Sequence, residues 1–146
     1  MRIAIIAVGK VKQAGLRGEL DEYLARIAKF APCGEVELRD GSDAELAVRF
    51  ERAIPPRTIV VALEVEGVAY DSPGLAAFLG RSEVDGAGTL AFLLGGAFGL
   101  PKAISAKANL KLSLSSLTFS HRLARLILAE QLYRAFTILR NVPYAH

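Results

Sequence analysis

The sequence predicts an α/β fold with three layers, in which helices cover both faces of a mostly parallel sheet. Short apolar runs rich in β-branched residues alternate along the chain with segments whose apolar residues recur at helical spacing. Two of the strand-like runs, 58–65 and 89–94, are apolar almost throughout, as is typical of parallel strands buried on both faces. Regular alternation of strands and helices favours a sheet sandwiched between helices.

The first half of the chain predicts two strands and two helices. A short apolar run closed by glycine predicts a buried strand over 2–9, and an alternating run predicts a strand near the sheet edge over 35–39. Apolar residues at helical spacing predict helices over 16–30 and 43–54, and prolines follow both closely. Asp43 is expected to cap the second helix.

The second half predicts three more strands and three more helices. Ile-Val-Val-Ala-Leu within 58–65 is the strongest strand signal and predicts a central strand. The other predicted elements are strands over 89–94 and 110–114 and helices over 72–79, 101–108 and 122–139. Ligands of such folds bind beyond the carboxyl ends of the strands. The segments to inspect are therefore 63–67, 95–99 and 115–120.

Composition predicts one folded domain spanning residues 1–146. The hydrophobic fraction is 52% and the charged fraction 23%, which excludes a disordered chain. The apolar start is too short for a signal peptide or membrane span, so we expect a cytoplasmic protein without a membrane partner. With Cys33, His121 and His146 as its only cysteine and histidines, the chain cannot assemble a zinc-type ligand set from Cys and His, and metal-independent chemistry is expected.

Positive charge is concentrated in the last third of the chain. Residues 101–146 carry seven Lys and Arg against Glu130 alone, a formal charge of +6, whereas the first hundred residues carry −3. This asymmetry suggests that the C-terminal third faces an anion such as a phosphate backbone. A solvated basic helix face is the alternative interpretation.

A glycine turn, Gly95-Gly96-Ala97-Phe98-Gly99, follows the strand predicted over 89–94. It matches neither the dinucleotide fingerprint nor a P-loop, which disfavours a nicotinamide oxidoreductase. The glycines could make a tight turn only, or they could let an adenine or ribose press against the backbone.

Hydroxyl side chains cluster in the segment 113–120, within an otherwise apolar run. Ser120 is expected to cap the following helix, and the other hydroxyls could satisfy turn amides. Their number favours a polar ligand instead.

The final helix and the chain end hold further candidates. His121 and Arg125 lie four residues apart on one face, as do Glu130 and Arg134, whose pairing would orient the arginine. The helix is apolar on most sides, which predicts that the sheet covers one side and a second subunit of a two-fold dimer the other. Tyr144 and His146 could be a free tail or could reach a neighbouring subunit's pocket.

Taken together, several C-terminal segments resemble the SPOUT methyltransferases, and within them the RlmH type, which methylates N3 of a pseudouridine in large-subunit ribosomal RNA. The similar segments are 94–99, 112–118 with His121 and Arg125, 130–135, and Pro143-Tyr144, together with 7–10 and Tyr23-Leu24 near the start. The resemblance spans the whole chain. It implies a C-terminal segment threaded into a trefoil knot, a homodimer, S-adenosylmethionine as the methyl donor and no metal.

The resemblance also assigns roles to residues. It implies that Arg134, Tyr144 and His146 are catalytic and that His121, Arg125 and Arg134 bind the substrate. The implied cofactor residues are Leu63, Gly95, Gly96, Gly99, Ser115, Ser116, Leu117, Thr118, Phe119 and Ser120. Methyl transfer to an imide nitrogen needs alignment of the reactants and a base or cation at the ring.

One departure concerns the chain end. The family typically ends Pro-Tyr-His followed by a basic residue, whereas this chain ends Pro143-Tyr144-Ala145-His146. Either His146 reaches the same place, or its role is lost or taken by Tyr144. The expected substrate is ribosomal RNA on assembled ribosomes; the alternatives are a SPOUT enzyme with another RNA target atom and an inactive ribosome-binding module.

Overall fold

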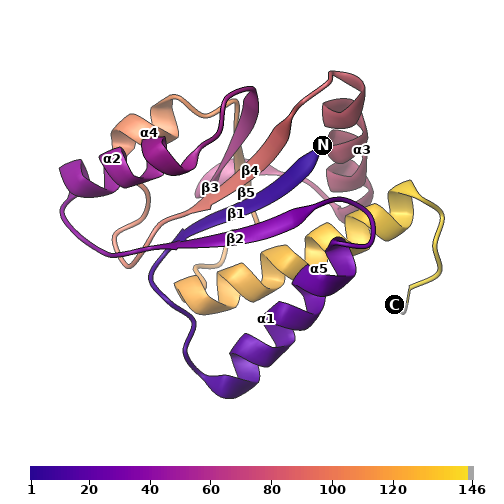
Figure 1. Ribbon diagram of the computed structural model, residues 1–146, viewed down its shortest axis with the longest axis horizontal. Helices are drawn as coiled ribbons and strands as arrows, with labels where there is room; N and C mark the ends of the chain where they lie inside the picture. Colours follow the sequence, from indigo (N-terminus) through magenta and orange to yellow (C-terminus); the bar gives the residue numbers. More distant parts are fainter. Residues whose placement is uncertain (145–146) are drawn as a thin grey trace.

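The computed structural model describes residues 1–144, which form a five-stranded sheet between two layers of helices (Figure 1). All strand pairings are parallel, and the strand order is β2-β1-β4-β3-β5. The strands are β1 (Arg2–Val8), β2 (Cys33–Leu38), β3 (Thr58–Ala69), β4 (Thr89–Leu94) and β5 (Leu110–Ser113). The predicted α/β class and the edge position of β2 are confirmed. The threading of the chain into a knot stays a prediction.

The helices divide between the two faces of the sheet. They are α1 (Ala14–Ile27), α2 (Asp43–Ala53), α3 (Ser72–Val84), α4 (Lys102–Ala106) and α5 (His121–Leu139). On one face Ile3, Ile5 and Ala7 of β1 pack in a core with α1, α3 and α5. On the other face Ala4, Ile6 and Val8 pack with α2 and α4. Successive side chains of a strand point to opposite faces, so β1 contributes to both cores.

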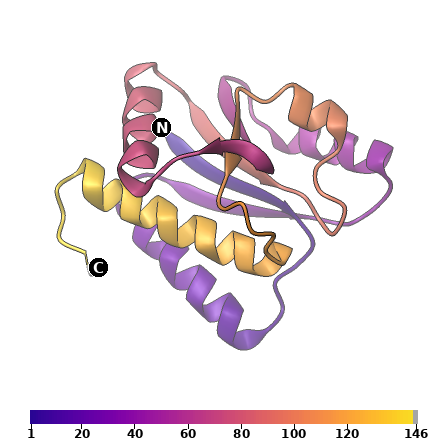
Figure 2. The ribbon, with the colours of Figure 1, turned by 180° about the vertical axis from the view of Figure 1, so that it is seen from behind.

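The strand prediction for 58–65 was wrong about its central position and its burial. β4 occupies the centre of the sheet and is buried along its whole length, whereas only Val61 and Ala62 of β3 are buried. β3 pairs with β4 only over Thr58–Ala62 and then runs on to Ala69. Its pairing with β5 shifts register between Leu63 and Val68: the strand curls between these residues (Figure 2), and Val68 and Ala69 pair again with Leu112 and Ser113. β3 therefore projects beyond the layers that would cover it.

Helix ends differ slightly from the predictions. The cap of α2 is Ser42 rather than Asp43: its hydroxyl accepts from the Glu45 amide, and the Glu45 carboxylate accepts from the Ser42 amide, a capping box. α1 ends at Ile27, where a turn begins in which the Phe30 amide donates to the Ile27 carbonyl at 2.8 Å. Within residues 1–144, no helix is long and apolar enough to cross a membrane.

Candidate functional site

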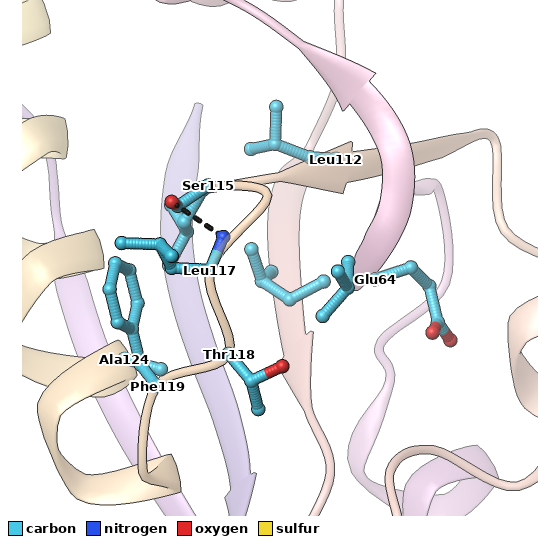
Figure 3. A pocket seen from close by; sticks show the side chains of 10 residues that line it. Glu64, Leu112, Ser115, Leu117, Thr118, Phe119 and Ala124 are labelled. Atoms are coloured by element: carbon cyan, nitrogen blue, oxygen red, sulfur yellow. Dashed lines mark hydrogen bonds between the residues drawn. The ribbon is translucent and has the colours of Figure 1, made fainter.

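A cleft lies at the carboxyl edge of the sheet, between the segments that follow β3, β4 and β5. It consists of a hollow of about 390 Å³ beside the glycine turn and an adjoining one of about 110 Å³ beside the loop 114–119 (Figure 3). The two share Leu63, Thr118, Phe119 and Ala124 in their walls. This is where ligands of parallel α/β sheets bind, as the strand ends predicted.

The glycine turn forms one wall of the cleft. The Gly99 amide donates to the Gly96 carbonyl at 3.0 Å, and Gly99 has a φ of +79°. A Cβ at Gly95 would overlap the backbone of Gly99, so only glycine allows the turn to close this tightly. Gly95, Gly96 and Gly99 all line the larger hollow. The glycines therefore both make the tight turn and leave backbone atoms accessible in the wall of the cleft.

The loop between β5 and α5 uses several of its hydroxyls internally. The Ser113 hydroxyl donates to the Ser115 carbonyl at 3.0 Å, and the Ser115 hydroxyl accepts from the Leu117 amide at 3.0 Å. Ser120 caps α5 by accepting from the Leu123 amide, as predicted. Thr118 is exposed and faces both hollows. The turn-forming interpretation therefore accounts for Ser113, Ser115 and Ser120, and Thr118 is left to meet a ligand.

The cleft suits a nucleoside-sized organic ligand. Its larger hollow lies within the range of small-molecule sites, which are mostly apolar with a few polar groups. Leu63, Leu94 and Phe119 supply the apolar surface, and the Thr118 hydroxyl supplies a polar one. The Glu64 carboxylate points away from Leu117 and Phe119 (Figure 3). In the described part of the chain, no group of three His, Cys, Asp or Glu side chains could hold a metal ion.

A separate hollow of about 260 Å³ lies at the other end of α5, lined by Arg134 and Tyr144 among others. Glu130 accepts from both: 2.8 Å from the Arg134 guanidinium and 2.9 Å from the Tyr144 hydroxyl. The Arg134 guanidinium lies 4.7 Å from the centre of the Tyr144 ring, a cation–π contact. The hydrogen bond to Glu130 raises the pKa of Arg134. Burial, helped by Tyr23 and Glu130, raises the pKa of Tyr144 well above its usual range.

Comparisons with known proteins identify the family. A family model described as "Predicted SPOUT methyltransferase" matches residues 1–146. The chain belongs to the SPOUT methyltransferases. It is 50% identical to the "Ribosomal RNA large subunit methyltransferase H" of Sorangium cellulosum (strain So ce56), over all of both chains. It is 41% identical to the protein of that name from Pelobacter propionicus (strain DSM 2379 / NBRC 103807 / OttBd1), again over all of both chains.

A solved structure shares the fold of this SPOUT methyltransferase. The probable methyltransferase of Bordetella pertussis Tohama I superposes with a TM-score of 0.60 at 16% identity, covering 92% of this chain and 95% of the other. At this identity the similarity supports the architecture alone.

Most of the predicted cofactor residues of this SPOUT methyltransferase lie around the cleft. Of the predicted cofactor residues, only Ser116 does not line it. The residues that do are Leu63, the three glycines, Ser115 and Leu117–Ser120, and the substrate candidate His121 lines it as well. Sequence reasoning gave no role to Glu64, although it lies in the segment 63–67 selected for inspection, and it missed Ala124; both line the cleft. The position of Glu64 just after Leu63 at a strand end was the available signal. Ala124 lies one helical turn after Ser120, and that spacing could have indicated it.

The structure does not bring Arg125 to the cleft, where a substrate contact was expected. Its side chain is 1% exposed and donates to Glu35 at 3.1 Å and to Glu37 at 2.5 Å. It also donates to the carbonyls of Val8 and Gly9, the latter at 3.0 Å. These contacts lie on the side of α5 that is buried against the sheet. Arg125 instead joins the start of α5 to the ends of β1 and β2.

Two of the predicted catalytic residues, Arg134 and Tyr144, line a different hollow from the predicted cofactor residues. Arg134 follows His121 by thirteen residues along α5, about 20 Å at the rise of an α-helix. The two hollows also share no lining residue. His146 lies outside the described residues. Arg134, Glu130 and Tyr144 form what we call the Arg134 cluster. The described chain therefore does not assemble the cleft and the Arg134 cluster into one site.

Proposed function

We propose that this SPOUT methyltransferase transfers a methyl group from S-adenosylmethionine to N3 of a pseudouridine in large-subunit ribosomal RNA. The observation that carries the proposal is full-length similarity to proteins named as large-subunit ribosomal RNA methyltransferases, in a chain whose strand-end cleft suits the donor. Bound S-adenosylmethionine supplies an electrophilic methyl group on a positively charged sulfur. Assembled ribosomes are the proposed form of the substrate, which makes the cytoplasm the compartment of the reaction.

The cleft residues would bind and orient the donor. Leu63 and Phe119 offer apolar surface to the adenine, and the glycine turn offers backbone without side chains in the way. The Thr118 hydroxyl is free to bind a polar group of the donor. Because both reactants must be aligned, much of the rate enhancement would come from this rigid positioning.

A second protomer would complete the site. One chain holds the cleft and the Arg134 cluster about 20 Å apart, so they can meet only across a subunit boundary. The outer side of α5 and the following turn expose Leu123, Ile138 and Val142, at 49%, 40% and 41%. A two-fold dimer that buries these apolar side chains would bring the Arg134 cluster of one chain to the cleft of the other.

Arg134 would act on the target base. Its cation is held in place by Glu130 and would stabilise the negative charge that develops on the pyrimidine ring when N3 loses its proton. Tyr144 would have a positioning role and would not be the base that deprotonates N3. Its raised pKa keeps the phenol protonated, and its hydroxyl donates to Glu130. His146 stays a candidate base.

Mass spectrometry of ribosomal RNA from a strain lacking the gene tests the proposal. The N3-methylated pseudouridine should disappear and should return with the wild-type gene, but not with Arg134→Ala. Arg140→Ala is the matched control, since Arg140 lies on the same helical end and pairs with Glu83 at 2.7 Å outside either hollow. Persistence of the modified nucleoside in the deletion strain, or loss of methyl from another atom, would overturn the assignment.

A further inference from the structure

The segment joining β1 to α1 presents two lysines to solvent around a buried anchor. Val11 is 3% exposed and packs with Leu20 and Ala129. Lys10 and Lys12, on either side of it, are exposed. Burial of Val11 therefore fixes the segment while its neighbours point outward.

Hydrogen bonds hold the same segment to the body of the protein. The Gly9 amide donates to the Leu38 carbonyl at 2.8 Å, and the Val11 amide donates to the Glu37 carboxylate at 2.9 Å. The Gly9 carbonyl accepts from Arg125 at 3.0 Å. The lysines thus stand on a preformed support, so a ligand would not have to order the backbone.

The carboxylates beneath the segment already have arginine partners. Glu35 pairs with Arg17 at 2.6 Å and with Arg125 at 3.1 Å. Glu37 pairs with Arg125 and, at 3.4 Å, with Arg17. Arg17 also pairs with Asp21 at 2.7 Å. Each of these three carboxylates thus has an arginine partner, and none of them pairs with Lys10 or Lys12.

Arg122 adds a third exposed cation next to the segment. Both views show the chain after β1 passing beside the start of α5, where Arg122 follows His121 (Figures 1 and 2). Within residues 1–144, neither Lys10, Lys12 nor Arg122 forms an ion pair. We call these three residues the basic rim.

The basic rim lies beside the mouth of the cleft. His121 lines the larger hollow, and Arg122 is its neighbour in the chain. At the other side, Val8 lies against Gly96, since a Cβ there would come 3.2 Å from Val8 Cγ1. The segment carrying the lysines starts directly after Val8 and so borders the glycine wall.

We infer that the basic rim binds the RNA phosphates that flank the target nucleotide; this rests on the proposed function. A base that enters the cleft leaves its flanking backbone across the mouth, where unopposed cations on a preformed support can bind phosphates. Such contacts position the strand without reading its sequence, and releasing their counterions makes binding salt-dependent.

The test measures binding and methylation separately, using assembled ribosomes from a strain lacking the gene. The double variant Lys10→Gln/Lys12→Gln should bind them about tenfold more weakly at moderate salt, with a slope of log affinity against log salt lower by about 1.4. Its S-adenosylmethionine affinity, measured by calorimetry, should match the wild type. The control Lys29→Gln/Lys107→Gln removes two exposed lysines elsewhere and should leave the slope unchanged.

Outcomes for the rim and for the proposed function are distinguishable. Suppose that the wild type binds and methylates, and that the Lys10/Lys12 variant has the same affinity and slope. This result would overturn the proposed role of the basic rim and leave the proposed function standing. A wild type that binds the ribosomes with the rim-dependent slope but does not methylate pseudouridine would overturn the proposed function and support the basic rim. Absence of binding by the wild type would overturn both.

Discussion

Arg125 is a buried cation whose contacts tie three elements together. Its guanidinium lies between Glu35 and Glu37 of β2 and the carbonyls that end β1, and its Nε has no hydrogen-bond partner among the described residues. A charge taken out of water is costly unless paired, so the carboxylates and the arginine depend on one another. Because Ala124 and His121 line the cleft within one helical turn of Arg125, we expect the same contacts to position the wall of the cleft.

Replacing Arg125 by methionine should destabilise the fold and weaken donor binding together. Two carboxylates would lose a buried partner, so we expect the free energy of unfolding to fall by about 3 kcal/mol in urea titrations. S-adenosylmethionine affinity should also fall, because the start of α5 is released. Arg125→Lys keeps the positive charge but loses the forked arrangement of donors. Its stability and its S-adenosylmethionine affinity should therefore lie between those of the wild type and of Arg125→Met.

If Arg125→Met lost stability but kept full donor affinity, the positioning role would be wrong. Stability equal to the wild type would contradict the burial argument itself.

The glycine turn after β4 illustrates how a backbone requirement shapes a binding wall. Gly95 packs directly on Gly99, and both lie in the wall of the larger hollow. A side chain at Gly95 would push the turn open rather than enter free space. The shape of this wall of the cleft therefore depends on how tightly the glycine turn closes.

Gly95→Ala should reduce S-adenosylmethionine affinity at least about tenfold, since even a methyl group overlaps backbone atoms that cannot rotate away. Calorimetry measures the loss. The matched control is Gly18→Ala, in the interior of α1 with no atom near its added Cβ. It should keep the affinity and raise the free energy of unfolding by about 0.5–1 kcal/mol. Equal affinities in the two variants would show that the turn does not form the donor wall.

The packing of α5 organises the molecule as a whole. α1 and α3 lie on either side of it in one layer, so part of the apolar surface that predicted a second subunit is covered by the chain itself (Figure 1). The side chains that remain exposed lie on the outer side of the helix and just after it. These exposed side chains, Leu123, Ile138 and Val142, extend along α5 from the end near the cleft to the end near the Arg134 cluster.

Mixed dimers test whether the two ends act in trans. At an S-adenosylmethionine concentration well below the Kd of the Gly95→Ala chain, Arg134→Ala and Gly95→Ala chains should each be nearly inactive alone. After mixing and reassembly, half of the dimers would hold one intact composite site, restoring about a quarter of wild-type activity. Methyl-transfer assays on ribosomes from the deletion strain measure the recovery. If no activity returned although heterodimers formed, each chain would have to act by itself.

The local patterns of the chain were sufficient to predict its helices, its strands and the edge of the sheet where the cleft lies. Apolar periodicity, prolines and the Ser120 cap depend on near neighbours, so they predicted the helices and strands within a few residues. The strand-end rule and the family resemblance together located the cleft, including Leu63, the glycines and Thr118.

Three features depend on contacts between distant segments. β3 and β4 have similar apolar runs, and their order in the sheet decides which is central. Arg125 looked like a substrate residue because its partners Glu35 and Glu37 lie some ninety positions away along the chain. The basic rim arises because folding pairs Glu35 and Glu37 with arginines and leaves Lys10 and Lys12 without an ion pair among the described residues. Pairing and burial are properties of the packed chain, and a linear pattern of charges does not contain them.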